Sequence, residues 1–331
     1  MKDMLSPWQA LWELLRWAKR PFAALFPPVL SEHADGVDSF YMFLVGMSTF
    51  FSLLIAGLIV FFAVRYARGR KADRTRPPES NLVLEIVWST VPLVLSVVIF
   101  FWGARLYLRL FTEPLGGYGE VVYVVGKQWM WKVQHPQGPM EIGALHAPMG
   151  IPIRLVMTSQ DVIHDFSIPA LRIKRDVVPG RYTSLWFQAT RTGEFPIYCS
   201  EYCGTLHSQM LGKLVIQSPA AYAAWLAQGA AAGTAIQAGE RLFTSLGCGG
   251  CHGAEGGAIR APQLAGIFGR PVPLQSDGFA TADEAYLRES ILFPGRKVVA
   301  GYAPVMPTFA GQINEEQMVE LIAYLRSLRL P

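Results

Sequence analysis

The sequence is short of charged residues and of cysteine, and each shortage narrows what the chain can be. Charged residues make up 16% of its 331 residues and apolar residues 51%, a balance that is unusual for a soluble protein. The net charge of +4 is modest, and much of it comes from a basic run at residues 65–76, so the charge does not indicate nucleic-acid binding. The only four cysteines form two close pairs, which favours two local sites over a disulfide framework: Cys199/Cys203 and Cys248/Cys251.

Residues 1–36 also lack a convincing signal peptide, because no uninterrupted apolar segment there ends in a small-residue cleavage site. Tryptophan and leucine alternate with basic residues in this stretch, in the amphipathic pattern of an interfacial helix. An N-terminal extension without fixed structure is the alternative, and the pattern does not decide between the two.

Two long apolar runs follow, at residues 40–64 and 82–108. Each has about the length of a helix that crosses a ~30 Å hydrocarbon core. The basic, proline-containing segment between them predicts a transmembrane hairpin over residues 37–112. Basic loops stay on the cytoplasmic side, so everything after residue 112 is expected on the outer face of the membrane. A hairpin buried in a soluble protein is the alternative, and the basic flank disfavours it.

Residues 118–218 are expected to form an all-β domain and residues 237–331 a mainly α-helical one. The first range carries short β-branched or aromatic runs separated by Gly and Pro, at the spacing of a sandwich or barrel. A short helix and the small-residue segment 229–233 predict a linker within residues 219–236. Helical periodicity then recurs at residues 238–246, 283–292 and 315–328.

The densest group of metal-binding residue types lies at residues 199–210, Cys-Ser-Glu-Tyr-Cys-Gly-Thr-Leu-His-Ser-Gln-Met. Thiolate and thioether ligands combined with imidazole select copper, whereas zinc has no use for a methionine and a blue-copper site needs one thiolate. A disulfide within this segment would leave the other donors unexplained. No general base stands beside an open coordination site, so the group indicates electron transfer. Its members are Cys199, Cys203, His207, Met210 and, upstream, His164.

This segment resembles the binuclear copper (CuA) site of cytochrome c oxidase subunit II. The resemblance implies that the two cysteines bridge two coppers and that His164 and His207 each bind one copper. Met210 and the backbone carbonyl of Glu201 would be weak axial ligands. The Glu201 side chain would reach a magnesium ion that is shared with subunit I.

Two further residues take roles from the same resemblance. Trp129 and Trp131 are expected on one face of a strand, and Trp129 matches the surface aromatic residue where an electron enters from cytochrome c. The family usually has another aromatic residue where Met130 stands here. Glu85, at the start of the second span, matches a glutamate at the mouth of a proton path into subunit I. The structural alternatives are a core tryptophan and a solvated interfacial carboxylate.

A second redox site is indicated by Cys248-Gly-Gly-Cys251-His252, the c-type haem attachment pattern. Its surroundings resemble small class I cytochromes c, which take their second axial ligand from a proline-rich loop before the last helix. Met306 in Pro-Val-Met-Pro fits that place, and Met318 on the last helix is the competitor. A His/Met pair raises the haem potential. Because the iron would then have no open site, this haem should only transfer electrons.

The sequence is thus identified as a member of the cytochrome c oxidase subunit II family: a two-helix hairpin, a cupredoxin-like CuA domain and a fused class I cytochrome c domain. The resemblance implies a bacterial inner-membrane protein that passes electrons from an external cytochrome or complex III-type donor, through haem c and CuA, to haem a of subunit I. Oxygen reduction on subunit I would be coupled to proton pumping. Subunit III and membrane lipid are further expected partners.

The charge of the β domain indicates which protein delivers electrons to it. An oxidase that meets a soluble basic cytochrome usually presents acidic residues, and this domain has few, so the fused cytochrome is expected to be the immediate donor. A CuA-containing nitric oxide reductase and a copper-delivery protein remain alternatives, whereas quinol oxidases generally lack the CuA ligands. The basic residues of the domain include Lys127, Lys132, Arg172, Lys174, Arg175 and Arg191.

Overall fold

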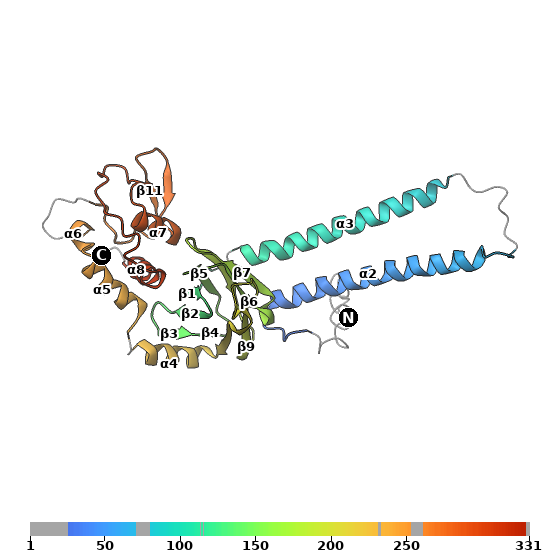
Figure 1. Cartoon of the computed structure of the whole chain (residues 1–331), viewed down its shortest axis with the longest axis horizontal. Coiled ribbons are helices and arrows are strands. Elements are labelled where there is room, and N and C mark those ends of the chain that lie inside the picture. Colours follow the sequence, from blue (N-terminus) through green and yellow to red (C-terminus); the bar gives the residue numbers. More distant parts are fainter. Residues whose placement is uncertain are drawn as a thin grey trace, which may run out of the picture. The chain divides into compact units, whose positions relative to one another are not determined.

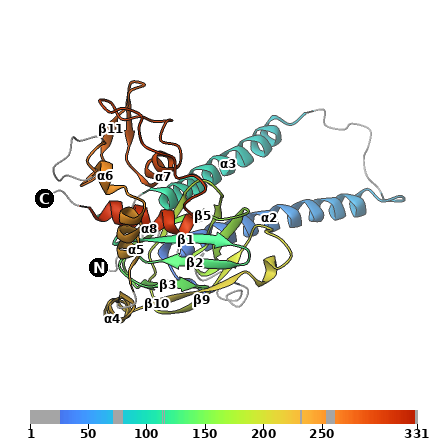
Figure 2. The same ribbon diagram turned by 60° about the vertical axis from the view of Figure 1, so that its left-hand side comes forward.

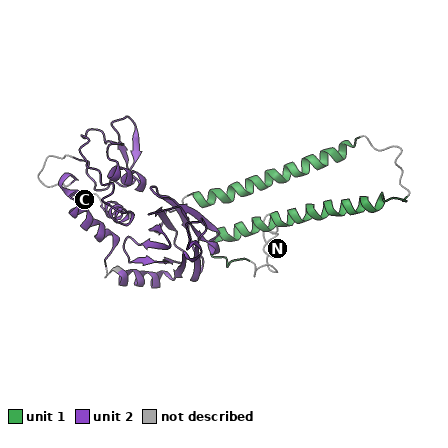
Figure 3. Cartoon of the chain, in the orientation of Figure 1, with its two compact units in different colours: residues 1–112 green, residues 113–331 purple. Residues whose placement is uncertain are grey.

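The structure is a computed structural model that describes residues 26–70, 80–112, 114, 116–230, 233–252 and 261–328 (Figure 1). Most of the expected N-terminal extension, half of the basic loop and the middle of the expected linker lie outside these residues. The chain divides into two compact units, residues 1–112 and 113–331, which Figure 3 colours separately.

Unit 1 is a helical hairpin of α2 (Glu32–Arg65) and α3 (Leu82–Phe111), both long and apolar enough to cross a membrane. The most apolar stretch of each helix has no buried residue. Apolar surface of this extent marks a membrane or protein interface, which argues against the buried hairpin of a soluble protein. Both helices are longer than the apolar runs. α2 begins eight residues ahead of its run, after the Ser31 cap, whereas α3 begins with its run, after the Asn81 cap, and extends beyond it to Phe111.

Aromatic packing joins the two helices within unit 1. The ring of Trp102 on α3 lies 5.3 Å from that of Phe40 and 5.4 Å from that of Phe43, both on α2. The Phe40 ring also lies beside Gly103, where a Cβ would stand at an ordinary contact distance of 3.5 Å. The contact fixes the end of the hairpin opposite the loop.

Unit 2 begins with a sandwich of two five-stranded sheets (Figures 1 and 2). Sheet A has the order β3-β2-β1-β5-β8 and sheet B the order β4-β10-β9-β6-β7. Neighbouring strands are antiparallel except for the parallel pairs β1/β5 and β4/β10. The strands are β1 (Glu120–Lys127), β2 (Met130–Gln134), β3 (Met140–Ile142), β4 (Ala144–Pro148), β5 (Ile153–Ser159), β6 (His164–Ile168), β7 (Ile173–Val177), β8 (Thr183–Phe187), β9 (Gly193–Cys199) and β10 (Leu211–Gln217), with 3-10 turns η2 (Pro169–Leu171) and η3 (His207–Gln209).

The rest of unit 2 is mainly helical. α5 and α8 each begin with a capping box, at Thr234 and Asn314 respectively. They cross so closely at Gly239 that a Cβ there would lie 2.0 Å from the carbonyl oxygen of Glu320. A small antiparallel pair, β11/β12, departs from the helical expectation. The elements are α4 (Pro219–Ala230), α5 (Ala235–Ser245), α6 (Gly249–His252), β11 (Pro271–Pro273), β12 (Phe279–Thr281), α7 (Glu284–Leu292) and α8 (Glu315–Ser327).

Candidate metal and haem centres

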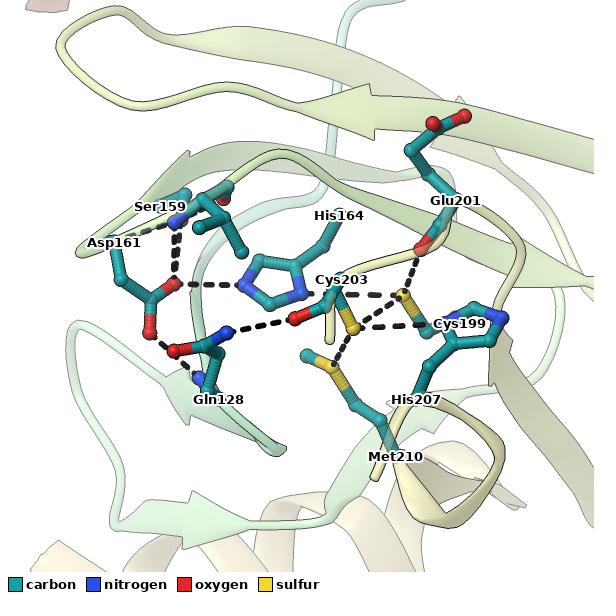
Figure 4. Close-up of polar contacts among 10 residues, drawn as sticks. Gln128, Ser159, Asp161, His164, Cys199, Glu201, Cys203, His207 and Met210 are labelled. Atoms are coloured by element: carbon teal, nitrogen blue, oxygen red, sulfur yellow. Dashed lines mark hydrogen bonds and ion pairs between the residues drawn. The ribbon is translucent and has the colours of Figure 1, made fainter. Parts of the chain in front are cut away.

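The loop between β9 and β10 brings the expected copper ligands together at one end of the sandwich (Figure 4). Cys199 ends β9, and His164 begins β6, which pairs with β9. One ligand atom each of His164, Cys199 and Cys203 lie within 4.8 Å of one another, and all three residues are buried. Soft donors gathered in this way form a candidate metal site.

The two sulfur atoms are the centre of the cluster. Cys199 Sγ lies 3.7 Å from Cys203 Sγ, far beyond the ~2.05 Å of a disulfide, and both cysteines are free. Cys199 Sγ also lies 3.9 Å from His164 Nδ1 and 3.2 Å from the backbone oxygen of Glu201. The Glu201 carboxylate points away from the sulfur atoms in Figure 4.

The second sulfur has its own pair of neighbours. Cys203 Sγ lies 3.5 Å from His207 Nδ1 and 3.8 Å from Met210 Sδ. Met210 is completely buried, so its thioether is available only to this cluster. All six residues that the sequence analysis singles out therefore surround one pair of sulfur atoms, with an imidazole nitrogen on each side, a donor set that fits copper.

Hydrogen bonds behind the cluster orient His164. Asp161 Oδ1 lies 2.9 Å from His164 Nε2, which leaves Nδ1 directed at the sulfurs. The other Asp161 oxygen accepts from the backbone N–H of Gln128 at 2.7 Å, and the Gln128 amide donates to the Cys203 carbonyl at 2.7 Å. Sequence reasoning missed both residues. The three-residue spacing from Asp161 to His164 was the only local signal.

The electrostatics of the two thiols differ. Burial opposes ionisation of Cys199, but hydrogen bonds, the strongest of them with His164, together outweigh it and lower the pKa of that thiol to about 7. Burial raises the pKa of Cys203 to about 12, and the neighbouring Cys199 adds to the effect. For His164, burial lowers the pKa, but Cys199 and Asp161 raise it on balance. Two thiolates side by side thus need a bound cation, which is the condition that a metal meets.

The position of Trp129 corrects the expectation that it shares a strand face with Trp131. β2 begins at Met130, and Lys127 pairs with Met130, so Gln128 and Trp129 form the turn between β1 and β2. Only Trp131 lies on the strand. It is fully buried, and its ring meets that of His164 at 5.8 Å.

Trp129 instead packs against the metal-binding loop. A Cβ on Gly204 would lie 3.3 Å from Trp129 Cζ2 and 2.9 Å from Gln128 Nε2, and Gly204 has a φ of +122°. The glycine thus serves both a left-handed backbone and a close approach. The half-exposed Trp129 ring lies directly beside the Cys203 segment.

The second candidate centre is a cavity in the helical part of unit 2. Cys248, Cys251, His252 and Met306 all line it, although they come from two segments far apart in the sequence. Apolar side chains from α7 and α8, such as Leu287 and Leu321, form much of the remaining wall. Two thiols, an imidazole and a thioether around an apolar cavity fit a covalently bound haem.

The His252 ring has a fixed tautomer. Its Nδ1 lies 2.8 Å from the Pro262 backbone oxygen, which can only accept a hydrogen bond, so Nδ1 carries the proton. Nε2 is therefore left as a metal donor. Met306 lines the same cavity, whereas Met318 is 2% exposed within the core around α8 and does not line it.

Glu85 lies in the first turn of α3 and is exposed. Its carboxylate accepts from the backbone N–H of Asn81 at 3.4 Å, and the Asn81 side chain accepts from the Leu84 N–H at 3.1 Å. Glu85 therefore takes part in the N-terminal cap of this helix.

Two family models match the chain. "Cytochrome C oxidase subunit II, periplasmic domain" matches residues 123–218, and "Cytochrome c" matches residues 236–329. The expected fold class is thereby confirmed: two apolar helices, a cupredoxin-like β-sandwich and a helical cytochrome c region.

Curated relatives give the same picture over a longer stretch. The "Cytochrome c oxidase subunit 2" of Synechocystis sp. is 31% identical over 63% of this chain and 77% of its own length. The protein of that name from Alkalihalophilus pseudofirmus is 28% identical over 84% of this chain and 83% of its own length. Among solved structures, the periplasmic domain of subunit II of the Bradyrhizobium japonicum oxidase is 29% identical, with a TM-score of 0.34, over 36% of this chain and 96% of that one.

Proposed function

Because the chain belongs to the cytochrome c oxidase subunit 2 family, we propose that it is the subunit through which electrons enter a haem–copper oxidase of the aa3-like class. Family membership makes it part of an oxidoreductase complex with an electron-transfer role, which implies CuA copper, haem c and a subunit I partner. The finer proposal is a relay from an external donor through this chain's haem c and CuA to haem a of subunit I. Oxygen reduction there would be coupled to proton translocation.

One observation carries the proposal: a single compact unit holds both a buried two-thiol cluster and a cavity that is lined by Cys248, Cys251 and His252. When bound, the copper pair would supply one one-electron redox centre and the haem iron a second. Among the described residues, both clusters consist of metal-binding and haem-binding residue types, which suits electron transfer. The pairing supports electron transfer within one chain.

The copper-binding roles are divided among the six clustered residues. Cys199 and Cys203 would bridge the two ions, and His164 and His207 would be terminal ligands through Nδ1. The Met210 thioether and the Glu201 carbonyl would be weak axial donors. The burial of His164, Cys199 and Cys203 at 8% exposure or less argues against a copper-delivery protein, whose ligands must be exposed for exchange.

The haem-binding roles follow the lining of the cavity. Cys248 and Cys251 would form the thioether links, His252 Nε2 would be the proximal donor and Met306 the distal one. Pro262 keeps the imidazole in the required tautomer through its carbonyl. With His252 and Met306 both available to hold the iron, the haem would serve electron transfer.

The apolar helices anchor the chain in a membrane and the CuA domain lies outside it. We assign the membrane to the bacterial inner membrane, with the segment after Arg65 on the cytoplasmic side. Glu85 would then lie at the cytoplasmic edge as a candidate for proton uptake, and its exposure is compatible with that role. The Glu201 carboxylate would contribute to a magnesium site shared with subunit I. Subunit III, lipid and an external cytochrome complete the proposed partners.

The test is electron paramagnetic resonance of the oxidised full-length chain in detergent, loaded with copper and haem. The expected spectrum combines one unpaired electron shared by two coppers with a low-spin haem. Substituting Ser for Cys203 should abolish sharing between the coppers and leave the haem signal unchanged. A mononuclear copper signal from the wild-type chain would overturn the proposal.

A further inference from the structure

The outer face of sheet A is covered by the chain's own haem domain, residues 237–328. Val121, Tyr123 and Val125 of β1 belong to one buried hydrophobic cluster together with Val319 and Ile322 of α8. Figure 2 shows α8 lying along β1. These strand residues alternate with Val122, Val124 and Gly126, which face the interior of the sandwich. A β-sandwich face that would otherwise meet solvent is thus part of a core that two domains share.

Ion pairs hold both ends of this interface. At one end, Lys132 of β2 pairs with Glu316 in the first turn of α8. At the other, Glu284 of α7 lies 3.7 Å from Arg154 of β5 and 3.7 Å from Arg326 of α8. The Glu284 side chain is only 5% exposed, and it pairs with these two guanidinium groups, one from each domain.

A third contact ties α7 to a loop of the β domain. Arg288 donates to the backbone oxygen of Gly180 at 2.9 Å, and its guanidinium lies 6.0 Å from the centre of the Tyr182 ring. Arg288 is held in place by Glu315, at the start of α8. Three separate points, on β2, β5 and the loop before β8, therefore fix the orientation of the haem domain.

The strand under α8 also touches the copper site. A Cβ on Gly126 would lie 2.9 Å from Cδ2 of His164, so the backbone of β1 packs directly on that imidazole. On the far side of α8, Leu321 and Leu325 line the haem cavity. One helix and one strand thus connect the two candidate centres through continuous packing.

We infer that the haem domain works from this one fixed position on sheet A, and that the Lys132–Glu316 and Arg154–Glu284 pairs are the contacts that fix it. A tethered domain that searches for its partner would need no such contacts. The position itself follows from packing, while its kinetic consequence rests on the proposed relay. Electron transfer between the two centres then requires no movement of the domain.

The first test is zero-length carbodiimide cross-linking of the full-length chain in detergent, followed by mass spectrometry. Lys213 and Glu194, which lie 3.1 Å apart within sheet B, serve as the internal control. The inference predicts a Lys132–Glu316 cross-link alongside the control link. In the exchanged variant Lys132→Glu/Glu316→Lys, the reversed link should form as well. A control link without either interdomain link would overturn the inference.

The second test is kinetic. In the haem- and copper-loaded chain, the rate constant of intramolecular electron transfer should not change when glycerol raises the viscosity. The single reversal Lys132→Glu should lower the rate constant or make it depend on viscosity, and the exchanged pair should restore it. A wild-type rate that falls with viscosity would contradict a fixed position. If the copper and haem spectra are as proposed while the cross-link is absent, the fixed interface alone fails, and the proposed function stands.

Discussion

Asp161 Oδ1 lies 2.9 Å from Nε2 of His164, and this contact turns the opposite ring nitrogen toward Cys199. A carboxylate behind a ligating imidazole fixes the ring and increases its basicity. The contact therefore links the turn between β1 and β2, through Gln128, to the copper site.

The first prediction concerns Asp161→Ala. Loss of the carboxylate frees the His164 ring and leaves the Gln128 N–H unpaired, so copper affinity should fall about 10- to 100-fold. Competitive copper titration with a chelator measures this change. Glu194→Ala, which removes an exposed carboxylate on sheet B, should leave the affinity unchanged. Equal affinity in the Asp161 variant and the wild type would show that this contact does not orient the ligand.

The second prediction concerns Gly204→Ala. The added Cβ would meet Gln128 and Trp129 in a backbone conformation that favours glycine, so the free energy of unfolding should fall by about 2 kcal/mol or more. Copper stoichiometry should fall with it, because the affected segment carries Cys203. Gly150→Ala is the control. Gly150 has a φ of +77° but open space around it, so its loss of stability should come from the strained backbone alone. Equal losses in both variants would mean that the contact with Trp129 is unimportant.

Both redox centres could be predicted from the sequence because most of their donors are local. The segments 199–210 and 248–252 each carry a spacing that only a few chemistries use, and only His164 and Met306 come from other segments. The sequence did not predict Asp161 and Gln128 as supports, since their contacts are made by the folded sandwich. Likewise, Trp129 was expected on a strand, and only the pairing of Lys127 with Met130 defines the turn that holds it.

Three strands carry a weak strand signal in the sequence, for physical reasons. β3 and β7 are edge strands, and β7 (Ile-Lys-Arg-Asp-Val) buries only its first and last residues. Edge strands carry polar side chains that hide the hydrophobic signal. β9 contains Pro196, which ordinarily argues against a central strand. The packing of α8 on β1 joins segments almost two hundred residues apart, beyond the reach of any periodicity.

The third prediction concerns Gly239→Ala at the crossing of α5 and α8. The new Cβ would stand 2.0 Å from the Glu320 carbonyl oxygen, so the helices must separate and stability should fall by about 3 kcal/mol. Thermal unfolding followed by haem absorbance measures the loss. Gly249→Ala meets only the Phe243 ring, at 3.5 Å, and should be tolerated. A stable Gly239 variant would contradict the close crossing.

The fourth prediction concerns pH and the buried cluster beneath α4. His135 is fully buried, with Nε2 3.0 Å from Glu141, while Nδ1 faces Glu120 at 3.4 Å and the Tyr222 hydroxyl at 3.2 Å. Burial lowers the pKa of His135, but its hydrogen bonds to the two carboxylates raise it overall above 6.5. Burial raises the pKa of Glu141, but bonds from His135 and His146 lower it overall below 4.5.

The directions of these two pKa shifts define a pH window for stability. The stabilisation of the folded state by His135 is complete below pH 6.5 and is lost as the pH rises through its raised folded pKa. That by Glu141 is complete above pH 4.5 and is lost as the pH falls through its lowered folded pKa. His135→Gln should therefore lower the free energy of unfolding most, by about 2 kcal/mol, between pH 4.5 and pH 6.5. Thr183→Val is the control: it removes a hydroxyl that donates to the backbone oxygen of Asp176, away from this cluster, so its effect should be the same across the window and above it. A His135 effect that does not vary with pH would refute the charged cluster.

The central claim is that one chain passes electrons from its own haem to its own copper centre, and rapid photoreduction tests it most directly. A single electron is delivered to the haem of the fully loaded, full-length chain, and haem reoxidation and copper reduction are followed together. The account predicts that both proceed with one shared rate constant that does not change with protein concentration. A haem that stays reduced, or a rate proportional to protein concentration, would contradict the account.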